Sequence, residues 1–389
     1  MKKWLNALTT GAACAIVGGT LLAAMTVVRR SDAAPAGHLV LTDDNTTNNT
    51  GTIMAVRDRS LQVQGTLTTG GTGDTDVIYA GENGVSIVPN GDGACLYIAD
   101  NQSSDIAAFV WPALTKTGNY SGAGSGYNAG MSLAGRGGYL FATYVASSTL
   151  GVWAINPDCS LTLDETLNTV PTPVGLAATP DGRTVIVASG TKVVSYSIMQ
   201  GGQLEAHGPY SSTGAVGVDI TADSKYAVIA ERNGNQLYVW TKVGLYPINS
   251  DGTLDPRTDF GGDGSFGDGV AAEYVRFSPD ERFIYVTGLA ENYVAGWLTT
   301  LNFTESPLSV TYSGCHAASS QQTVSWGGGT MAQPFGAGGL FYVASPSSTI
   351  YVLGINEANG CLSEVAGSPF ATGKGALLES LAAWPPRPF

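Results

Sequence analysis

Basic residues are scarce in this chain of 389 residues. Its 18 Lys and Arg residues stand against 31 Asp and Glu residues, which gives a formal net charge of −13 at pH 7. Binding to the phosphates of nucleic acids needs clustered Lys and Arg side chains, and so does binding to an anionic membrane surface. We therefore expect no nucleic-acid partner, and no membrane partner once any targeting segment has been removed.

Histidine and closely spaced cysteines are scarce as well. The three histidines, His38, His207 and His316, lie far apart, and the chain has no CxxC motif. A structural zinc site takes four Cys or His ligands in short spacings, so we expect no zinc site. A G-x-S-x-G nucleophile elbow between a strand and a helix is also missing, which argues against that class of serine hydrolase.

Charged residues of both signs make up only 13% of the chain, whereas hydrophobic residues make up 43% and glycine contributes 52 residues. Such a chain is too apolar to remain disordered and too rich in glycine for a helical bundle. The number of domains depends on whether the chain repeats, because a repeat fold can reach this length around one closed core.

The N-terminus has the features of a secretory signal. Two lysines precede an uncharged stretch over residues 4–28, and residues 34–36 supply an A-x-A cleavage pattern. We predict a signal peptide at residues 1–36 and a mature chain that is secreted or periplasmic. An uncleaved membrane anchor stays an alternative, because two arginines and an aspartate separate the apolar stretch from the cleavage pattern.

One unit recurs along the chain: a short apolar strand, a turn of the P-D-G type, and two β-rich strands separated by a polar turn. The clearest copies begin at Leu176, Ile220 and Val275, and weaker ones at Val85, Met131 and Met331. Their second strands begin 42 to 57 residues apart, at Leu96, Leu140, Val185, Ala227, Ile284 and Phe341. This period is typical of the blades of a β-propeller.

Both ends of the chain carry part of one more unit. Residues 38–67 have the pattern of second, third and fourth strands without a first, and residues 377–384 supply an apolar strand. A sheet that is apolar on both faces buries both only between like neighbours. We therefore predict an all-β fold: a single seven-bladed β-propeller over residues 37–389, with four-stranded antiparallel blades, closed by pairing of the C-terminal and N-terminal strands.

Four cysteines remain once Cys14, in the predicted signal peptide, is set aside. An even number in an exported chain suggests two disulfides. Pairing Cys159 with Cys361 would have to cross the ring, beyond the reach of a disulfide. Of the three connectivities we predict the one that joins neighbouring blades, Cys95–Cys159 and Cys315–Cys361.

Three segments carry a resemblance to a known family. They are S-P-D-E-R-F-I-Y-V-T at 278–287, F-Y-V-A-S at 341–345 and the segment N-E-A-N-G-C-L-S-E-V-A-G-S-P-F-A-T-G at 356–373. The chain resembles the seven-bladed propellers of the 6-phosphogluconolactonase-like and YVTN-repeat proteins over nearly all of residues 38–386. The resemblance implies the ring-opening of a sugar lactone, or the related closure of a muconate, with histidine, arginine and glutamate at the channel contributing to activity.

The channel mouth is the predicted location of the site, because two sets of loops open on that face of a propeller. Carboxylates and arginines that lie close together can position a substrate, act as a general base or stabilise an oxyanion. We predict Glu231 as the catalytic base and Arg276 as the oxyanion stabiliser. The predicted binding residues are Arg232, Glu273, Asp100, Tyr144 and Glu291. Solvated charges without a ligand are the alternative.

No cofactor is expected. The loop from Asp43 to Asn49 offers two carboxylates and three side-chain amides, so a divalent cation there stays an alternative. The oxygen-rich segment at 249–255 is interpreted as a turn, as are the dipeptides Asp181-Gly182, Asp223-Ser224 and Asp280-Glu281.

Two functions follow from these patterns. None of the three histidines falls on a predicted innermost strand, which favours a non-catalytic, monomeric scaffold that binds a small molecule, a glycan or a protein at the channel mouth. The alternative is a hydrolase that opens a sugar-type lactone, as the resemblance implies.

Overall fold

The computed structural model describes residues 38–73, 83–127, 130–231, 242–262, 270–290, 296–318, 329–332, 339–345, 348–374, 378 and 380–384. All of them belong to one of the two units into which the chain divides, Ser31–Phe389. The other unit, Met1–Arg30, lies outside the described residues, and the predicted signal peptide and domain boundary therefore stay predictions. No helix in the described part of the chain is long and apolar enough to cross a membrane.

The described elements are all β-strands. In chain order they are β1 (Leu39–Asp43), β2 (Thr50–Arg57), β3 (Ser60–Thr68), β4 (Val85–Asn90), β5 (Gly93–Asp100), β6 (Asp105–Trp111), β7 (Thr115–Tyr120), β8 (Met131–Arg136), β9 (Tyr139–Tyr144), β10 (Thr149–Ile155), β11 (Leu161–Asn168), β12 (Gly175–Ala178), β13 (Thr184–Ile198), β14 (Leu204–Ile220), β15 (Tyr226–Glu231), β16 (Lys242–Pro247), β17 (Thr258–Gly261), β18 (Val270–Phe277), β19 (Phe283–Ala290), β20 (Gly296–Glu305), β21 (Leu308–Ala318), β22 (Gly329–Ala332), β23 (Leu340–Ser345), β24 (Thr349–Ile355), β25 (Leu362–Glu364), β26 (Phe370–Ala371) and β27 (Ser380–Trp384).

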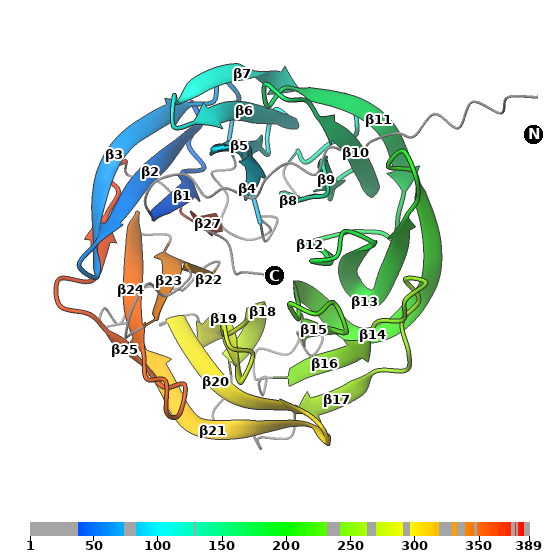
Figure 1. Ribbon diagram of the computed structural model, residues 1–389, viewed down its shortest axis with the longest axis vertical. Coiled ribbons are helices and arrows are strands. Elements are labelled where there is room, and N and C mark those ends of the chain that lie inside the picture. The colour runs from blue at the N-terminus through cyan, green and yellow to red at the C-terminus, as the bar shows by residue number, and fades with distance from the viewer. Residues whose placement is uncertain are drawn as a thin grey trace, which may run out of the picture. The chain divides into compact units, whose positions relative to one another are not determined.

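These strands form six antiparallel sheets set around a common centre (Figure 1). The sheets are β27-β1-β2-β3, β4-β5-β6-β7, β8-β9-β10-β11, β12 to β17, β18-β19-β20-β21, and β22-β23-β24-β25, with β26 also paired to β24. The lowest-numbered strand of each sheet lies innermost, except that β27 is innermost in the first and that β14 is a second innermost strand of the fourth. An all-β propeller of four-stranded antiparallel blades is thereby confirmed.

The prediction of seven separate blades is wrong, because the described strands form six sheets and the fourth of these has six strands. Two long strands, β13 and β14, run through this sheet. β13 pairs β12 along its first half, and its second half pairs the first half of β14, whose own second half pairs β15. A hydrogen bond from the Ile198 amide to the Arg183 carbonyl brings the two ends of β13 together (2.7 Å). The repeats that begin at Leu176 and Ile220 are therefore joined in one sheet.

The C-terminal strand closes the ring. β27 pairs β1 antiparallel along its whole length, from Leu39 opposite Trp384 to Asp43 opposite Ser380. The predicted pairing of the two chain ends is thereby confirmed. Closure gives the first sheet its innermost strand and leaves no inner edge there for another chain to pair with.

Burial explains why the strands have the composition they do. The second strand of a sheet is covered on both faces, so it forms an apolar run such as Leu340–Ser345, in which every residue is buried. An outermost strand is covered less: in β11 only Leu161 is buried, and Thr162, Leu163 and Asp164 are exposed. Apolar clusters fill the spaces between sheets, as where Val40 of the first sheet packs with Tyr342 of the last. A further cluster, which includes Ile186 and Tyr246, lies between the two halves of the fourth sheet.

Three of the turns between strands, those at 179–182, 221–224 and 278–281, share one geometry. In each, a hydroxyl donates to the carboxylate two residues later: Thr179 to Asp181 (2.6 Å), Thr221 to Asp223 (2.8 Å) and Ser278 to Asp280 (2.6 Å). The residue after the aspartate has a positive φ of 57° to 71°. Glycine takes this conformation without strain, whereas the serine and glutamate of the other two turns depend on these bonds to hold it. The interpretation of these dipeptides as turns is confirmed.

Both predicted disulfides are present, Cys95–Cys159 and Cys315–Cys361. The first joins β5 of the second sheet to the turn between β10 and β11 of the third, and the second joins β21 of the fifth sheet to the segment just before β25 of the sixth. Each bridge thus links neighbouring sheets.

The pairing of β27 with β1 predicts a large cost for removing Trp384, whose side chain is only 2% exposed. We expect Trp384→Ala to lower the free energy of unfolding by about 3 to 5 kcal/mol, because it empties a packed space at the closure. Urea unfolding followed by circular dichroism measures this. Val63→Ala, at a side chain on β3 that is 48% exposed, is the control and should change it by about 0.5 kcal/mol or less. Equal urea midpoints for Trp384→Ala and the wild type would show that the packing of Trp384 at the closure does not stabilise the fold.

Candidate functional site

The innermost strands pack against one another around the centre of the ring. β27, β4, β8, β12, β14, β18 and β22 contact in that order, and β22 contacts β27 again. Side chains on these strands, and the segments that lead into them, are therefore the ones that different sheets can bring together (Figure 1).

Asn83, just before β4, bonds to three other innermost strands. Its backbone amide donates to Ser132 Oγ (3.4 Å) and its carbonyl accepts from the Leu133 amide (2.7 Å), both on β8. Its side-chain Nδ2 donates to the Leu176 carbonyl on β12 (3.3 Å), and its Oδ1 accepts from Arg276 on β18 (2.6 Å). Because β8, β12 and β18 belong to different sheets, Asn83 lies where those sheets converge.

Gly84 adds the first sheet to this junction and also bonds within its own, second sheet. Its amide donates to Ser380 Oγ on β27 (2.7 Å), and its carbonyl accepts from the Ala99 amide on β5 (2.8 Å). A Cβ at this position would lie 2.7 Å from Asp43 Oδ2 and 3.1 Å from Ser380 Oγ. The close approach to the first sheet therefore requires glycine. We call Asn83 and Gly84 together the axial junction.

Arg276 points its guanidinium into the axial junction. Besides the bond to Asn83, its Nη1 donates to the carbonyls of Val218 (3.1 Å) and Val275 (2.8 Å). The side chain is partly exposed, and no carboxylate among the described residues forms an ion pair with it. A guanidinium held only by neutral oxygens keeps its whole positive charge available to an anion.

Two carboxylates come from the same pair of strands. Asp219 on β14 is partly exposed, and its Oδ2 accepts a hydrogen bond from the Phe277 amide on β18 (2.7 Å). It follows Val218, whose carbonyl holds Arg276. Glu273, a predicted binding residue, is partly exposed on β18 three residues before Arg276. Charged residues of both signs thus lie on the neighbouring innermost strands β14 and β18.

Glu231, the predicted base, lies in a different environment. Its side chain is wholly buried, and each oxygen has two partners. Oε1 accepts from Ser212 (2.7 Å) and Arg257, and Oε2 accepts from Thr213 and pairs with Lys242 (3.2 Å). The contacts of Glu231 and those of Arg276 have no partner in common in the described part of the chain.

Asp259 completes the ion network around Glu231. It pairs with Arg257 through both carboxylate oxygens (3.0 Å each) and with Lys242 (3.0 Å). The two negative charges of Glu231 and Asp259 thus balance the two positive charges of Lys242 and Arg257. The Tyr246 hydroxyl donates to the carbonyl of Ser211, the residue before Ser212. This compensated arrangement is typical of a structural network.

Asp100, a predicted binding residue, is also wholly buried. Its Oδ1 accepts from Asn49 Nδ2 (2.9 Å) and Thr69 Oγ1 (2.6 Å), and its Oδ2 accepts from Asn119 Nδ2 (3.3 Å). Burial first, and then the carboxyl of Asp105 opposite it on β6, raise the pKa of Asp100 to about 8. The group therefore carries a proton at neutral pH and joins the first sheet to the second.

The remaining predicted site residues are placed as follows. Tyr144 is wholly buried within the cluster between the second and third sheets, where burial raises its pKa, and a ligand at the surface does not reach it. Arg232 and Glu291 lie outside the described residues. Of the predicted set, Arg276 and Glu273 lie on the same innermost strand, β18, and Arg276 alone bonds to the axial junction among the described residues.

The oxygen-rich loops bond mainly within the protein. Asp43 Oδ1 accepts from the Asn45 amide (3.2 Å) and from Asn49 Nδ2 (2.9 Å). Asp44 accepts from three threonine hydroxyls, and burial raises its pKa nonetheless. Another acidic group, Asp223, Glu281 and Glu305, has ligand atoms within 4.8 Å of one another among the described residues. Lys225 pairs with Asp223, and the Ala222 amide donates to Glu281, so protein donors serve two of these carboxylates.

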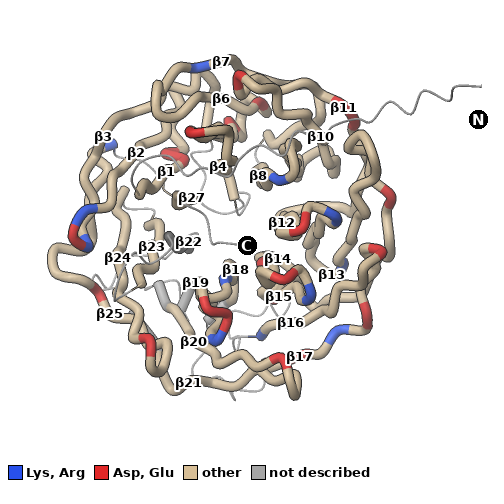
Figure 2. Tube along the Cα trace, viewed as in Figure 1, with Lys and Arg blue, Asp and Glu red and all other residues tan. Residues whose placement is uncertain are grey.

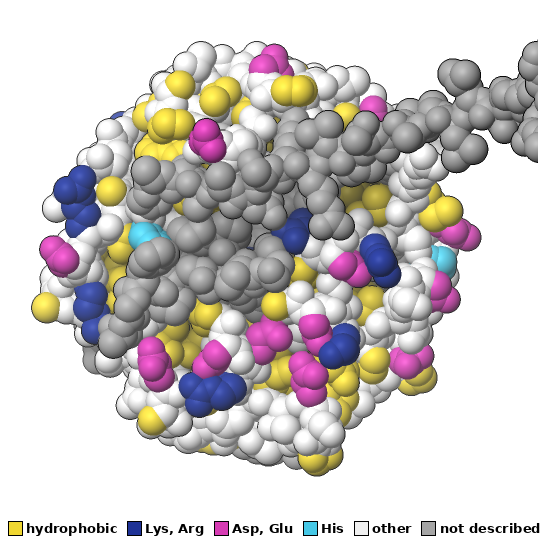
Figure 3. Space-filling view, viewed as in Figure 1, with side chains coloured by type: hydrophobic (Ala, Val, Ile, Leu, Met, Phe, Trp, Pro, Cys, Tyr) yellow, Lys and Arg dark blue, Asp and Glu magenta, His cyan; other side chains and the backbone are white. Residues whose placement is uncertain are grey.

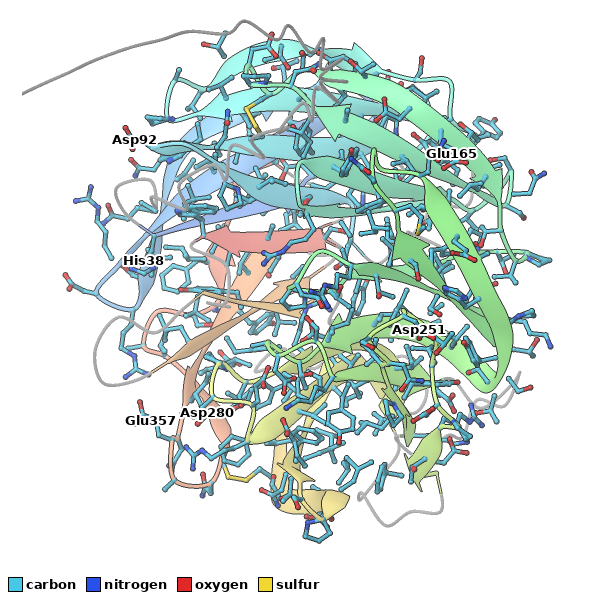
Figure 4. All side chains as sticks on the ribbon, turned by 45° about the vertical axis from the view of Figure 1, so that its right-hand side comes forward. His38, Asp92, Glu165, Asp251, Asp280 and Glu357 are labelled. Carbon is cyan, nitrogen blue, oxygen red and sulfur yellow. A yellow bond between two sulfur atoms is a disulfide. The ribbon has the colours of Figure 1, made fainter. Side chains whose placement is uncertain are left out.

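The histidines lie away from the axial junction. His38 precedes β1 and is labelled on the left side of the molecule in Figure 4. His207 Nε2 lies 2.7 Å from Ser197 Oγ, in the half of β14 that pairs the outer half of β13. His316 is on β21, the outermost strand of its sheet, and its side chain is outside the described part.

Charges on the visible surface are mixed. Figure 2 shows Asp and Glu positions interspersed with Lys and Arg positions along the trace, and Figure 3 shows side chains of both signs on the described part of the face seen. Ion pairs at the turns contribute to this pattern, such as Asp181 with Arg183 (3.8 Å) and Asp280 with Arg282 (2.7 Å). Such pairs are exposed and stabilise the fold little.

No protein-family model matches this chain, and no curated protein does. Solved structures do match it. A candidate 6-phosphogluconolactonase from Bacteroides fragilis gives a TM-score of 0.65 at 14% identity, over 90% of this chain and 98% of that one. The periplasmic gluconolactonase of Pseudomonas aeruginosa gives 0.64 at 15% identity, over 89% and 98%. A Lactobacillus plantarum protein gives 0.64 at 16% identity, over 89% and 99%.

The structural neighbours are thus 6-phosphogluconolactonase-like proteins with a β-propeller fold. At 14 to 16% identity this likeness shows the fold alone. What the site does must be argued from its own residues.

Two residues of the candidate site, Asp219 and Asn83, were missed in the sequence. Asp219 is a charged residue inside the apolar run Val216-Gly-Val-Asp-Ile, the same signal that singles out Arg276 in Tyr274-Val-Arg-Phe. Asn83 stands between predicted blades, where an asparagine is ordinary and nothing in the local pattern indicates a contact with three sheets.

The raised pKa of Asp100 predicts a pH dependence. Its folded value of about 8 lies above the ordinary value of 3.8, so the stability from the protonated group is fully present below about pH 4 and is lost as pH rises through 8. Asp100→Asn keeps a neutral group of the same shape at every pH. We expect the unfolding free energy of the wild type, relative to Asp100→Asn, to fall between pH 4 and 9 in urea titrations. Asp92→Asn, at an exposed turn, removes the same charge and is the control. If the difference in unfolding free energy between the wild type and Asp100→Asn stays flat or grows with pH, Asp100 is not protonated at neutral pH.

The ion network predicts that Glu231 acts on stability. Glu231→Gln leaves Arg257 and Lys242 without a buried carboxylate, so the free energy of unfolding should fall by about 3 kcal/mol or more. The exposed Glu205→Gln, on β14, is the matched control and should change it by about 0.5 kcal/mol or less. Differential scanning calorimetry measures the melting temperatures of the two variants. Equal melting temperatures for Glu231→Gln and Glu205→Gln would contradict a structural role for Glu231.

Proposed function

We propose that this protein hydrolyses a small sugar-type lactone at the centre of the ring, with Arg276 as the cation that binds the lactone carbonyl. The observation that carries the proposal is the placement of Arg276: a partly exposed guanidinium on an innermost strand, fixed by three neutral oxygens, without an ion pair among the described residues. The likeness in fold to structures named as lactonases supports the same reaction class.

The donors of Arg276 suit this role. A guanidinium has five N–H groups, of which Val218 and Val275 take the two on Nη1 and Asn83 takes one on Nη2. The Nε–H and the second N–H on Nη2 are left for a ligand. When water attacks a lactone, negative charge develops on the carbonyl oxygen, and a fixed donor pair stabilises that charge more than it stabilises the neutral ester.

Asp219 is the base in this proposal. The Phe277 amide holds one of its oxygens, and the side chain is partly exposed at the strand junction that also holds Arg276. A carboxylate in this position can take a proton from the attacking water. Glu231 as the base also remains a proposal, but its four partners favour the structural role. Glu273 is proposed to contact the substrate.

Binding without catalysis is the second candidate. The observation that favours it is the position of the histidines: His38 and His207 lie on segments away from the axial junction. In this case Arg276 would hold the same small molecule, a glycan or an acidic group of a partner protein. Two disulfides are compatible with a secreted or periplasmic protein for either function.

A lactone panel tests the proposal. We expect the purified protein to release acid from glucono-δ-lactone or a related small lactone in a pH-stat, above the rate of spontaneous opening. Arg276→Gln should lower kcat/KM about 10²-fold or more, as for loss of an oxyanion donor, and Asp219→Asn should do the same through the base. Arg183→Gln, an exposed arginine at a turn, is the matched control and should leave the rate unchanged.

Each result assigns a function. Wild-type rates in Arg276→Gln would move the site away from the axial junction. No hydrolysis across the panel, together with calorimetric binding of a lactone that Arg276→Gln abolishes, would favour the binding function instead.

A further inference from the structure

We infer that Asn83 positions Arg276 and keeps its charge unpaired, so that the axial junction binds a small polyhydroxy carboxylate, the class of acid that a sugar lactone yields. This inference rests on the proposed location of the site at Arg276, but it does not require that the protein catalyse hydrolysis.

The orientation of the Asn83 amide is determined by its partners. Its Nδ2 donates to the Leu176 carbonyl, which can only accept, and its Oδ1 accepts from Arg276, which can only donate. Exchanging the two ends of the amide would set a carbonyl against a carbonyl and an NH₂ against the guanidinium. The network therefore allows one orientation, in which an oxygen faces Arg276.

The backbone of Asn83 holds this amide in place. Its amide and carbonyl bond to Ser132 and Leu133 on β8, and Gly84 bonds to Ser380 on β27. The residue is thus anchored to two other sheets before its side chain reaches β12 and β18. A group anchored in this way can direct the guanidinium without the entropy cost of ordering a loose side chain.

The neutrality of Asn83 is the second part of the inference. An aspartate of the same shape would accept the bond from Arg276 equally well, but as an ion pair it would cancel the charge. Elsewhere this chain pairs arginines with carboxylates, as where Arg257 contacts Asp259 and Glu231. At the axial junction the three oxygens on Arg276 are all neutral, which leaves the cation for an incoming carboxylate.

The chemical class of ligand follows from the charge and the donors. Two remaining N–H groups of a guanidinium match the two oxygens of a carboxylate, and Asp219, at the same junction of β14 and β18, can accept a hydrogen bond from a hydroxyl group. A carboxylate at this junction disfavours a multiply charged anion. We therefore assign a singly charged, hydroxyl-rich acid rather than a phosphate.

Binding of sodium D-gluconate by isothermal titration calorimetry tests the inference, with D-sorbitol as the neutral polyol of the same length. We expect the wild type to bind gluconate and not sorbitol. Asn83→Asp should weaken gluconate binding about tenfold or more, because it pairs the cation. Asn90→Asp is the matched control, since Asn90 also donates to a carbonyl, that of Pro157 (2.9 Å), and gains the same charge; its affinity should equal that of the wild type.

A second variant separates charge from position. Asn83→Ser stays neutral and loses the side-chain oxygen that accepts from Arg276, so it should weaken gluconate binding less than Asn83→Asp does. Melting temperatures of both variants should confirm that they are folded.

In an Arg276→Gln background, Asn83→Asp should have no further effect on gluconate binding. Equal losses in the Ser and Asp variants would overturn the charge argument, and undiminished gluconate binding by Asn83→Asp, or none by the wild type, would overturn the inference as a whole. Lack of lactone hydrolysis alone would refute only the proposed reaction.

Discussion

Pairing of the last strand with the first is the contact on which the rest of this structure depends. Each sheet is apolar on both faces and is stable only between two neighbours. β27 comes from the C-terminal end and completes the sheet that β1 begins, so the first sheet is covered by the second on one side and by the last on the other. Without that pairing the first and last sheets would each expose an apolar face.

Once the apolar faces are buried, polar groups at the ends of the strands must find partners in the next sheet. At the turns, the Ala222 amide donates to Glu281, and Arg282 donates to the Glu357 carbonyl (2.6 Å). Figure 4 shows Asp280 and Glu357 labelled close together on these neighbouring elements. The axial junction serves the same purpose at the centre, because Asn83 and Gly84 bond to strands of the neighbouring and opposite sheets.

The treatment of charge differs between the buried network and the centre of the ring. Glu231 is surrounded by two cations and two hydroxyls, so its charge is compensated within the protein. Arg276 is oriented by three bonds as well, and within the described part of the chain all three go to neutral oxygens. A compensated ion contributes to the fold, whereas an oriented, uncompensated ion can act on a ligand. This contrast, and not the number of charged residues in a loop, singles out the functional candidate.

The sequence by itself determined the strands, the turns, the closure and the disulfides. These depend on short-range patterns, such as Thr-x-Asp before a positive φ, or on order along the chain, which places Cys95 and Cys159 on neighbouring blades. Tertiary structure alone decided that β13 and β14 join two repeats in one sheet, that Asp100 holds a proton, and that Glu231 is enclosed while Arg276 is not. The reason is physical: burial and charge compensation depend on atoms distant in the chain, and Asn83 reaches Arg276 only because the closed ring brings their strands to one centre.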